Sequence, residues 1–129
     1  TVRWFSPGAG DILEAAIAQV AQGIAQAHNC TAHVDYQRRY PATINTAPEA
    51  ALARAEGAAL GLVAVDPGPS MASEDFAFML GEKPGAYIWL GAARDGENPG
   101  LHSPRFDFND AVLPAGAELW VRLARLAAA

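Results

Sequence analysis

The sequence has little cysteine, no concentration of basic residues and no uninterrupted hydrophobic segment. Cys30 is the only cysteine among 129 residues, so no disulfide can form within the chain and a reducing, cytoplasmic compartment is expected. No run of Lys or Arg forms a basic stripe and the net charge is −5, so we expect no nucleic-acid partner. The longest apolar segments carry Gln, Glu or Arg every few residues, so we expect no membrane span.

The first residues also lack the features of a leader sequence. Thr1–Phe5 has neither a basic region nor an apolar region, so we expect that these residues are not a signal peptide. It begins without Met, from which we expect that the start of the protein was cut, processed or cloned away. The remaining composition, 51% hydrophobic and 18% charged, is typical of a soluble globular domain and argues against disorder.

The first 40 residues predict a strand, a helix and a second strand. Thr1–Phe5 is β-branched and aromatic, which favours a strand. A helix is predicted from Asp11 to about His28, because apolar residues recur every four positions on one face. Residues 31–40 then alternate, with Ala32, Val34 and Tyr36 on one face and His33, Asp35, Gln37 and Arg39 on the other, as in a half-buried strand.

The rest of the chain predicts three helices and two strands. One helix runs from Pro48 to about Leu60, one is capped by Ser73 with Phe76, Met79 and Leu80 inward, and the last starts at Leu113-Pro114 with Leu119, Leu123 and Leu126 inward. Residues 62–65 predict a short strand, and residues 86–90 predict a strand buried on both faces. The fold class is therefore α/β. Neither residues 1–40 nor residues 48–129 contain enough strands to cover their apolar helices.

His102 is the first candidate for chemistry. It lies on a loop bounded by Gly100 and Pro104, and a neutral imidazole on a stiff segment suits a metal ion. Ser103 and Pro104 would fix the local backbone, and Asp107 or Asp110 could hold the far ring nitrogen. The alternative is an ordinary surface or hydrogen-bonded histidine.

Glu74 and Asp75 form the second candidate. Two acidic residues after a capping Ser73 are typical of a helix start, where they complement the helix dipole. The functional alternative has one of them point into a cleft, where it orients a ligand or a metal-bound histidine. His28, His33 and the Arg38-Arg39 pair are interpreted as structural or surface residues, and no nucleophile elbow, phosphate loop or self-contained zinc motif is present.

Four blocks together resemble a known family. They are Val2–Phe5, Tyr36–Asn45, Met71–Phe78 and Leu101–Phe108. In this order and spacing the chain resembles the metallo-aminoacylase and carboxypeptidase family, on the branch of hippurate hydrolases and N-acyl-amino-acid amidohydrolases. The resemblance covers essentially the whole chain. Position 72 is commonly Gly in the family and is Ala here.

The resemblance implies a fold and a division of the chain. Such enzymes have an α/β catalytic domain and an inserted βαββαβ lid, which often makes a homodimer contact. Residues 1–40 would be the second half of the lid, residues 41–47 the hinge, and residues 48–129 the C-terminal segment of an α/β zinc-peptidase-like catalytic domain. A homodimer through the lid, or association with a missing N-terminal part, is therefore expected.

The resemblance also implies site residues and a cofactor. His102 matches the family's last metal ligand, in a pair of zinc or manganese ions. Glu74 and Asp75 match an acidic pair beside the cleft, and Ser103 would support His102. The other ligands and the catalytic Glu belong to upstream motifs that this sequence lacks, so we expect no catalytic residue here, possible absence of bound metal, and no activity from the chain alone.

In the intact enzyme, a metal-activated water would cleave the amide bond of an N-acyl amino acid, of which hippurate is the type. The alternative interpretation is a non-catalytic, truncated module for binding or dimerisation, in which residues 1–40 add an edge strand to a partner.

Overall fold

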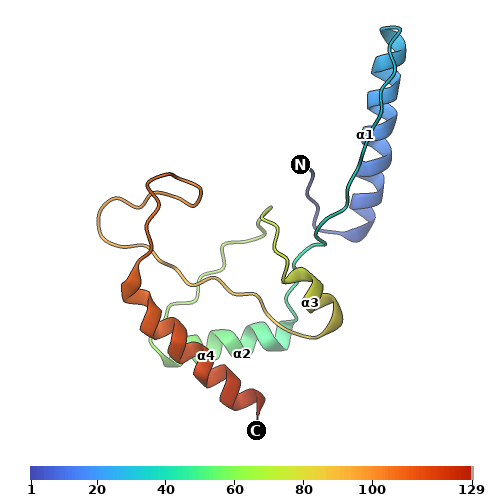
Figure 1. Ribbon diagram of the computed structural model, residues 1–129. Coiled ribbons are helices and arrows are strands. Elements are labelled where there is room, and N and C mark those ends of the chain that lie inside the picture. Colours follow the sequence, from blue (N-terminus) through green and yellow to red (C-terminus); the bar gives the residue numbers. More distant parts are fainter. Residues whose placement is uncertain (129) are drawn as a thin grey trace. The chain divides into compact units, whose positions relative to one another are not determined.

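The computed structural model describes residues 1–128, and in this range it contains helices joined by segments without regular structure (Figure 1). The α-helices are α1 (Pro7–Ala27), α2 (Ala47–Ala59), α3 (Ala77–Glu82) and α4 (Leu113–Ala127), and the 3-10 helix η1 (Asp110–Val112) precedes α4. Ala129, the last residue of the predicted catalytic segment, lies outside the described residues. Within residues 1–128, no helix combines the length and hydrophobicity needed to cross a bilayer.

The chain divides into two compact units. The first comprises Thr1–Ile44 and Pro67–Pro84, and the second comprises Asn45–Asp66 and the residues from Gly85 onward. Residues 67–84 therefore group with the N-terminal part of the chain. The predicted boundaries of lid, hinge and catalytic segment stay a prediction, because a division by contacts does not identify those roles.

Helix α1 starts earlier than predicted and stops where predicted. It begins at Pro7 after Ser6, whose extended backbone marks the N-cap, so Asp11 and Glu14 lie beyond the first turn. These two carboxylates pair with the guanidinium of Arg38, which lies in the segment that follows α1. At the C-terminus Asn29 has a positive φ of 53°, and its amide and that of Cys30 donate to the last carbonyls of the helix. This is the Schellman arrangement that a His-Asn stop favours.

The predicted strands are absent from residues 1–128. Residues 31–40 are without helix or strand, and they run back along α1 (Figure 1). Their side chains alternate as predicted, since Ala32, Val34 and Tyr36 are half-buried and the residues between them are exposed. A strand, however, is defined by hydrogen bonds to a neighbouring backbone, which these residues do not make in the described chain. The side-chain pattern is thus confirmed, whereas the α/β lid description is not.

The second unit is organised by α2 and α4, which pack against each other. Ala53 and Gly57 are the buried positions of α2, and Leu119 is the buried position of α4. Small side chains at i and i+4 allow the two helices to approach closely. Leu123 is half-buried, but Leu126 is 47% exposed, so the predicted inward face is only partly correct.

Local features mark both ends of α2. Gly61 follows the helix at a φ of +80°, which glycine adopts without steric cost, and this confirms the predicted stop. At the start, the N-cap residue Thr46 donates its hydroxyl to the Glu49 carboxylate, and its side chain does not cap the backbone amides of the helix. The same Thr46 exchanges hydrogen bonds with the backbone of Gly85 at 2.9–3.0 Å.

The third helix differs from the prediction. Helix α3 begins at Ala77 after Phe76, and Ser73 does not cap it. The carbonyls of Glu74 and Asp75 accept the first hydrogen bonds of the turn that leads into α3. Ala77 is the buried residue, at 2% exposure, while Met79 is 64% exposed. The helix is therefore shorter than predicted, and its inward face is set by its smallest side chain.

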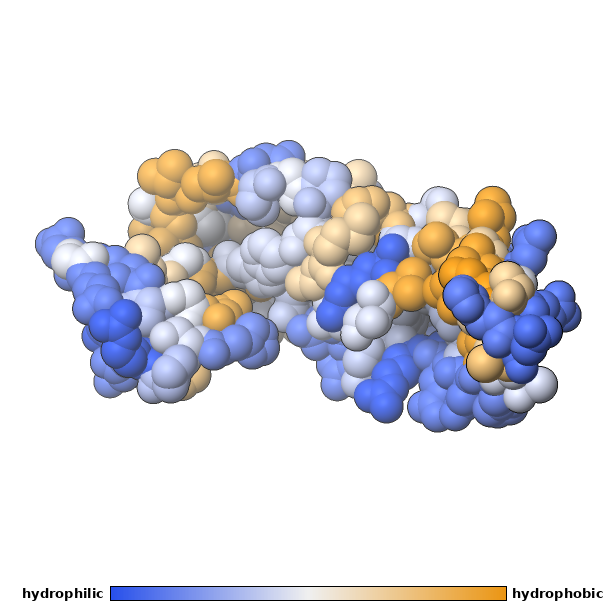
Figure 2. Space-filling model, turned by 90° about the horizontal axis from the view of Figure 1, so that it is seen from above, coloured by the Kyte–Doolittle hydropathy of each residue, from blue (hydrophilic) through white to orange (hydrophobic). Residues whose placement is uncertain are grey.

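Many apolar side chains remain at the surface, as the orange areas of Figure 2 indicate. On α1, Ile12, Val20 and Ile24 belong to the predicted apolar face and are exposed by 58–70%. Among residues 1–128, no large side chain is fully buried. The apolar stripe is therefore present, but nothing in the described chain covers it.

Candidate functional site

His102 occupies the corner of a tight turn. The Ser103 amide donates to the Gly100 carbonyl at 3.1 Å, and His102, between them, has a φ of +67°. A non-glycine residue rarely adopts this left-handed conformation, which costs roughly 1–2 kcal/mol. The side chain is exposed. The sequence-predicted candidate ligand thus projects from a strained backbone position, and such positions are enriched at functional sites.

Ser103 stiffens the turn, as the sequence suggested. Its hydroxyl accepts a hydrogen bond from the Arg105 amide at 3.2 Å, and its carbonyl accepts one from the Phe106 amide at 3.0 Å. The rings of Phe106 and Phe108 follow in an edge-to-face contact with centroids 5.1 Å apart. The backbone on the C-terminal side of His102 is therefore held locally.

The expected carboxylate partner of His102 is engaged elsewhere. Asp107 pairs with Arg94, with a 2.9 Å distance between Nη2 and Oδ2. Asp110 opens the 3-10 helix η1, which the Asn109 side chain caps. In the described part of the chain, no hydrogen bond reaches the His102 ring. Asp107, one of the two acids predicted to orient the His102 imidazole, therefore binds the guanidinium of Arg94 and not the imidazole.

Glu74 and Asp75 form a pair of interacting carboxyl groups. Glu74 is half-buried and accepts a hydrogen bond from the Asp75 amide on Oε1, at 3.0 Å, whereas Asp75 is exposed. A side-chain hydrogen bond with Glu74, together with repulsion from its negative charge, raises the pKa of Asp75. Asp75 therefore keeps its proton to a higher pH than an isolated aspartate does.

The predicted site residues fall in both units. Glu74 and Asp75 belong to the first unit, and His102 and Ser103 belong to the second. Across residues 1–128, no three His, Cys, Asp or Glu side chains gather as a metal site would require. A zinc site uses at least three protein ligands, and the His102 turn offers one. The residues described here do not by themselves complete a site for the metal pair.

The sequence interpretation missed a clamp formed by Asn45. Its side-chain amide donates to the Tyr87 carbonyl at 2.9 Å, and its side-chain oxygen accepts from the Tyr87 amide at 2.7 Å. Together with the hydrogen bonds between Thr46 and Gly85, these bonds connect the residues that precede α2 to the segment that follows α3. The Thr-x-x-Glu spacing of Thr46 and Glu49 was the signal available for part of this arrangement.

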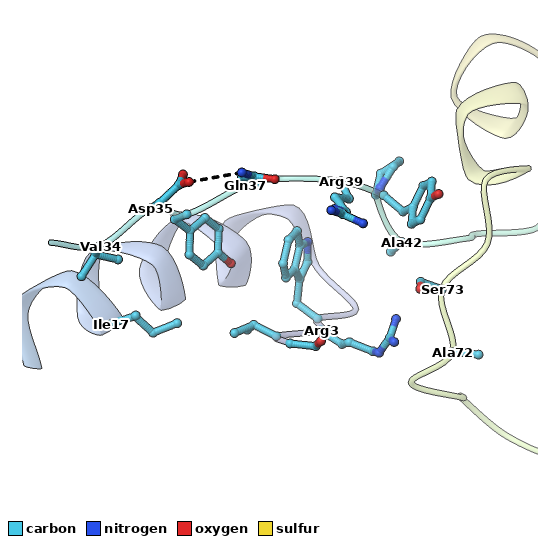
Figure 3. A pocket seen from close by; sticks show the side chains of 15 residues that line it. Arg3, Ile17, Val34, Asp35, Gln37, Arg39, Ala42, Ala72 and Ser73 are labelled. Atoms are coloured by element: carbon cyan, nitrogen blue, oxygen red, sulfur yellow. Dashed lines mark hydrogen bonds between the residues drawn. The ribbon is translucent and has the colours of Figure 1, made fainter. Parts of the chain in front are cut away.

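The sequence interpretation also missed a hollow in the first unit, with a volume of about 700 Å³ (Figure 3). Residues 1–4 form one wall and residues 34–42 form another, and Ile17 of α1 lies between them. Arg3 and Arg39 both line it. No spacing motif marks this feature, because its walls are distant in the sequence.

The family model described as peptidase family M20/M25/M40 matches residues 4–126 of this chain. The match covers nearly every residue, including the His102 turn and the Glu74–Asp75 pair. The chain therefore belongs to this family of hydrolytic enzymes, as the sequence blocks indicated. Members of the family generally depend on divalent metal ions.

Curated relatives carry related names. YhaA of Bacillus subtilis, provisionally an amidohydrolase, is 31% identical over 125 residues, covering 92% of this chain and 31% of the relative. The N-acetyldiaminopimelate deacetylase of Anoxybacillus flavithermus is 30% identical over 126 residues, covering 95% and 32%. The IAA-amino acid hydrolase ILR1-like 4 of Arabidopsis thaliana is 33% identical over 132 residues, covering 96% and 30%. The chain thus spans less than a third of the length of these relatives. No solved structure matches it significantly.

Proposed function

We propose that this chain is the part of a metal-dependent amidohydrolase that supplies His102 as one metal ligand. The family match over residues 4–126 is the observation that carries the proposal. The left-handed turn at His102 supports it, because strained backbone positions are enriched at functional sites. The exposed imidazole of His102 is also accessible to a metal ion. The remaining ligands would come from sequence outside these 129 residues.

The substrate class that we propose is an N-acyl amino acid, with hippurate-like compounds as candidates. Two relatives support this choice, since one is named a deacetylase of N-acetyldiaminopimelate and the other a hydrolase of IAA-amino acids. The first name describes removal of an N-acetyl group, and the second describes hydrolysis of an amino acid conjugate. Zinc and manganese are the candidate ions, and the cytoplasm is the candidate compartment, in line with the exposed and unpaired Cys30.

A chimeric enzyme tests the proposal. The matching segment of the Anoxybacillus flavithermus deacetylase would be replaced by this chain, and hydrolysis of N-acetyl and N-benzoyl amino acids would be measured with zinc or manganese. We expect amide hydrolysis by the chimera. His102→Ala should lower kcat by at least about 100-fold, because loss of a group that merely orients a ligand already costs 10–100-fold.

His33 provides the matched control for that experiment. It is exposed and lies in the segment that follows α1, so His33→Ala should leave the chimera's activity unchanged. A folded, metal-loaded chimera that is fully active with His102→Ala would refute the role of His102. The 129-residue chain alone should give no turnover with either metal.

A further inference from the structure

Side chains close the base of the loop on which His102 lies. This loop, residues 94–107 and here called the His102 loop, follows the segment after α3 and leads to η1 and α4 (Figure 1). Nη2 of Arg94 donates to Oδ2 of Asp107 at 2.9 Å and to the Asp107 carbonyl at 3.3 Å. The first and last residues of the loop are therefore bound to each other, although they are 13 positions apart in the sequence.

Two asparagine side chains reinforce this closure. Just outside the loop, the side-chain amide of Asn109 donates to the Ala93 carbonyl at 3.1 Å. Inside the loop, the side-chain oxygen of Asn98 accepts from the Arg94 backbone amide at 2.8 Å, and its side-chain amide donates to the Arg94 carbonyl at 2.6 Å. The backbone of Arg94 is thus held on one side of the loop, while its guanidinium reaches the other side.

A second ion pair in the His102 loop is more exposed than the first. Nη1 of Arg105 lies 2.7 Å from a carboxylate oxygen of Glu97, and their side chains are 71% and 67% exposed. A pair of this kind contributes little to stability, because water and salt screen it. The Arg94 side chain is 37% exposed, and it binds a backbone carbonyl in addition to a carboxylate. Closure of the loop therefore depends mainly on Arg94.

The position of the His102 imidazole depends on the backbone that carries it, because within residues 1–128 no hydrogen bond holds its ring. We propose that Arg94 is a positioning residue for His102: by closing the His102 loop, its guanidinium keeps the imidazole where a metal ion can bind it. This inference rests on the proposed function of His102 as a metal ligand. Displacement of a reacting group by about 1 Å, caused by a distant substitution, can cost on the order of 100-fold in activity.

Amide hydrogen exchange of the full chain tests the closure in the absence of metal. The amides of Ser103 and Phe106 donate to carbonyls within the His102 loop. In Arg94→Gln we expect these two amides to exchange about three- to tenfold faster, as the loss of a side-chain hydrogen bond predicts. Arg54→Gln, which removes an exposed arginine on α2, should leave both rates unchanged. Unchanged exchange in Arg94→Gln would overturn the proposal.

The zinc affinity of the chimera described above tests the effect on His102. Zinc would be titrated against a competing chelator, and kcat and KM would be measured on the same samples. Arg94→Gln should weaken zinc binding about 10-fold, the lower end of what loss of a residue that supports a ligand costs. It should lower kcat and leave KM nearly unchanged. Arg94→Lys should recover part of the affinity, because an ammonium group can still bind the Asp107 carboxylate.

A double substitution separates positioning from a general structural role. When His102→Ala is already present, Arg94→Gln should weaken zinc binding no further, because the imidazole that Arg94 positions is gone. Equal weakening with and without the imidazole would overturn the proposal. So would a chimera in which His102→Ala weakens zinc binding and Arg94→Gln does not, although the proposed ligand would then stand. If His102→Ala itself leaves zinc binding unchanged, the proposed function and this inference both fail.

Discussion

At the scale of single residues, His102 is set apart by its backbone. A φ of +67° is comfortable for glycine and costly for any residue with a Cβ. The turn is closed by its own hydrogen bond, and the exposed imidazole makes none in the described chain. The conformation therefore imposes a cost that no contact of the side chain offsets within residues 1–128.

This cost can be measured by comparing two substitutions. His102→Gly should be more stable than His102→Ala by about 1 kcal/mol in chemical denaturation, because only glycine accepts the positive φ freely. His28 is the matched control, since its φ is −106°. There the order should reverse, with the glycine variant less stable than the alanine variant. If the glycine and alanine variants had the same order of stability at both histidines, the backbone strain at His102 would be refuted.

The Glu74–Asp75 pair predicts a pH dependence. Because the pKa of Asp75 is raised in the folded state, the folded chain binds this proton more tightly than the unfolded chain does. The associated stability is present below the ordinary aspartate pKa and is lost as pH rises through the raised value. Glu74→Gln should lower the pKa of Asp75 in a carboxyl-carbon NMR titration and should stabilise the chain at neutral pH relative to acid pH. Glu82→Gln should leave the Asp75 titration unchanged.

Local sequence signals predicted the position of His102 but not the contacts of the residues around it. The placement of His102 on a short exposed turn followed from Gly100 and Pro104, which are local signals. The partner of Asp107 could not be predicted in this way. Arg94 lies 13 positions away, and whether its guanidinium reaches the Asp107 carboxylate depends on how the intervening loop folds. Nothing in the spacing distinguished His102 from Arg94 as the group that Asp107 would bind.

At the scale of elements, the helices were predictable and the strands were not. The ends of α1 and α2 were set by Asn29 and Gly61, whose left-handed conformations depend on the residue itself. A strand requires a second backbone alongside, and residues 31–40 have none in the described chain. Their alternating burial was correctly predicted because it needs only α1 on one side. Ser73 failed as a cap because α3 begins only at Ala77, with Phe76 at its N-cap position.

A glycine in α1 provides a prediction for this element. A Cβ at Gly10 would lie 2.8 Å from the Cε2 atom of the Trp4 ring, so Gly10→Ala requires the indole to move. We expect a destabilisation of about 1–3 kcal/mol in thermal or chemical denaturation. Gly23→Ala is the control, because no atom lies within 4 Å of its Cβ position. It should stabilise the helix by about 0.5–1 kcal/mol. Equal effects of the two changes would rule out the Trp4 contact.

At the scale of the whole molecule, the described chain buries little apolar surface. Its buried hydrophobic residues are Ala53, Ala77 and Leu119, while large side chains such as Ile12, Trp89 and Trp120 are more than half exposed. The sequence predicted this shortage, since its apolar helix faces outnumber the elements available to cover them. It could not predict how the described residues divide into two units, because that division depends on contacts between distant segments.

Calorimetry provides a test at this scale. The heat-capacity increase on unfolding reflects the apolar surface that becomes hydrated, and globular proteins give roughly 12–15 cal/mol/K per residue. The isolated chain should fall clearly below this range and should bind a dye that reports exposed apolar surface. A value inside the range, with no dye binding, would show that the exposed side chains are covered in solution.

The solitary thiol at the end of α1 has a practical consequence. Cys30 is exposed and free, and no other cysteine competes with it. A maleimide fluorophore or nitroxide will therefore attach at one defined point, just beyond the C-terminal end of α1, without prior mutagenesis. Air oxidation will also join two chains through a disulfide between their Cys30 residues, so preparations should be kept with a reductant.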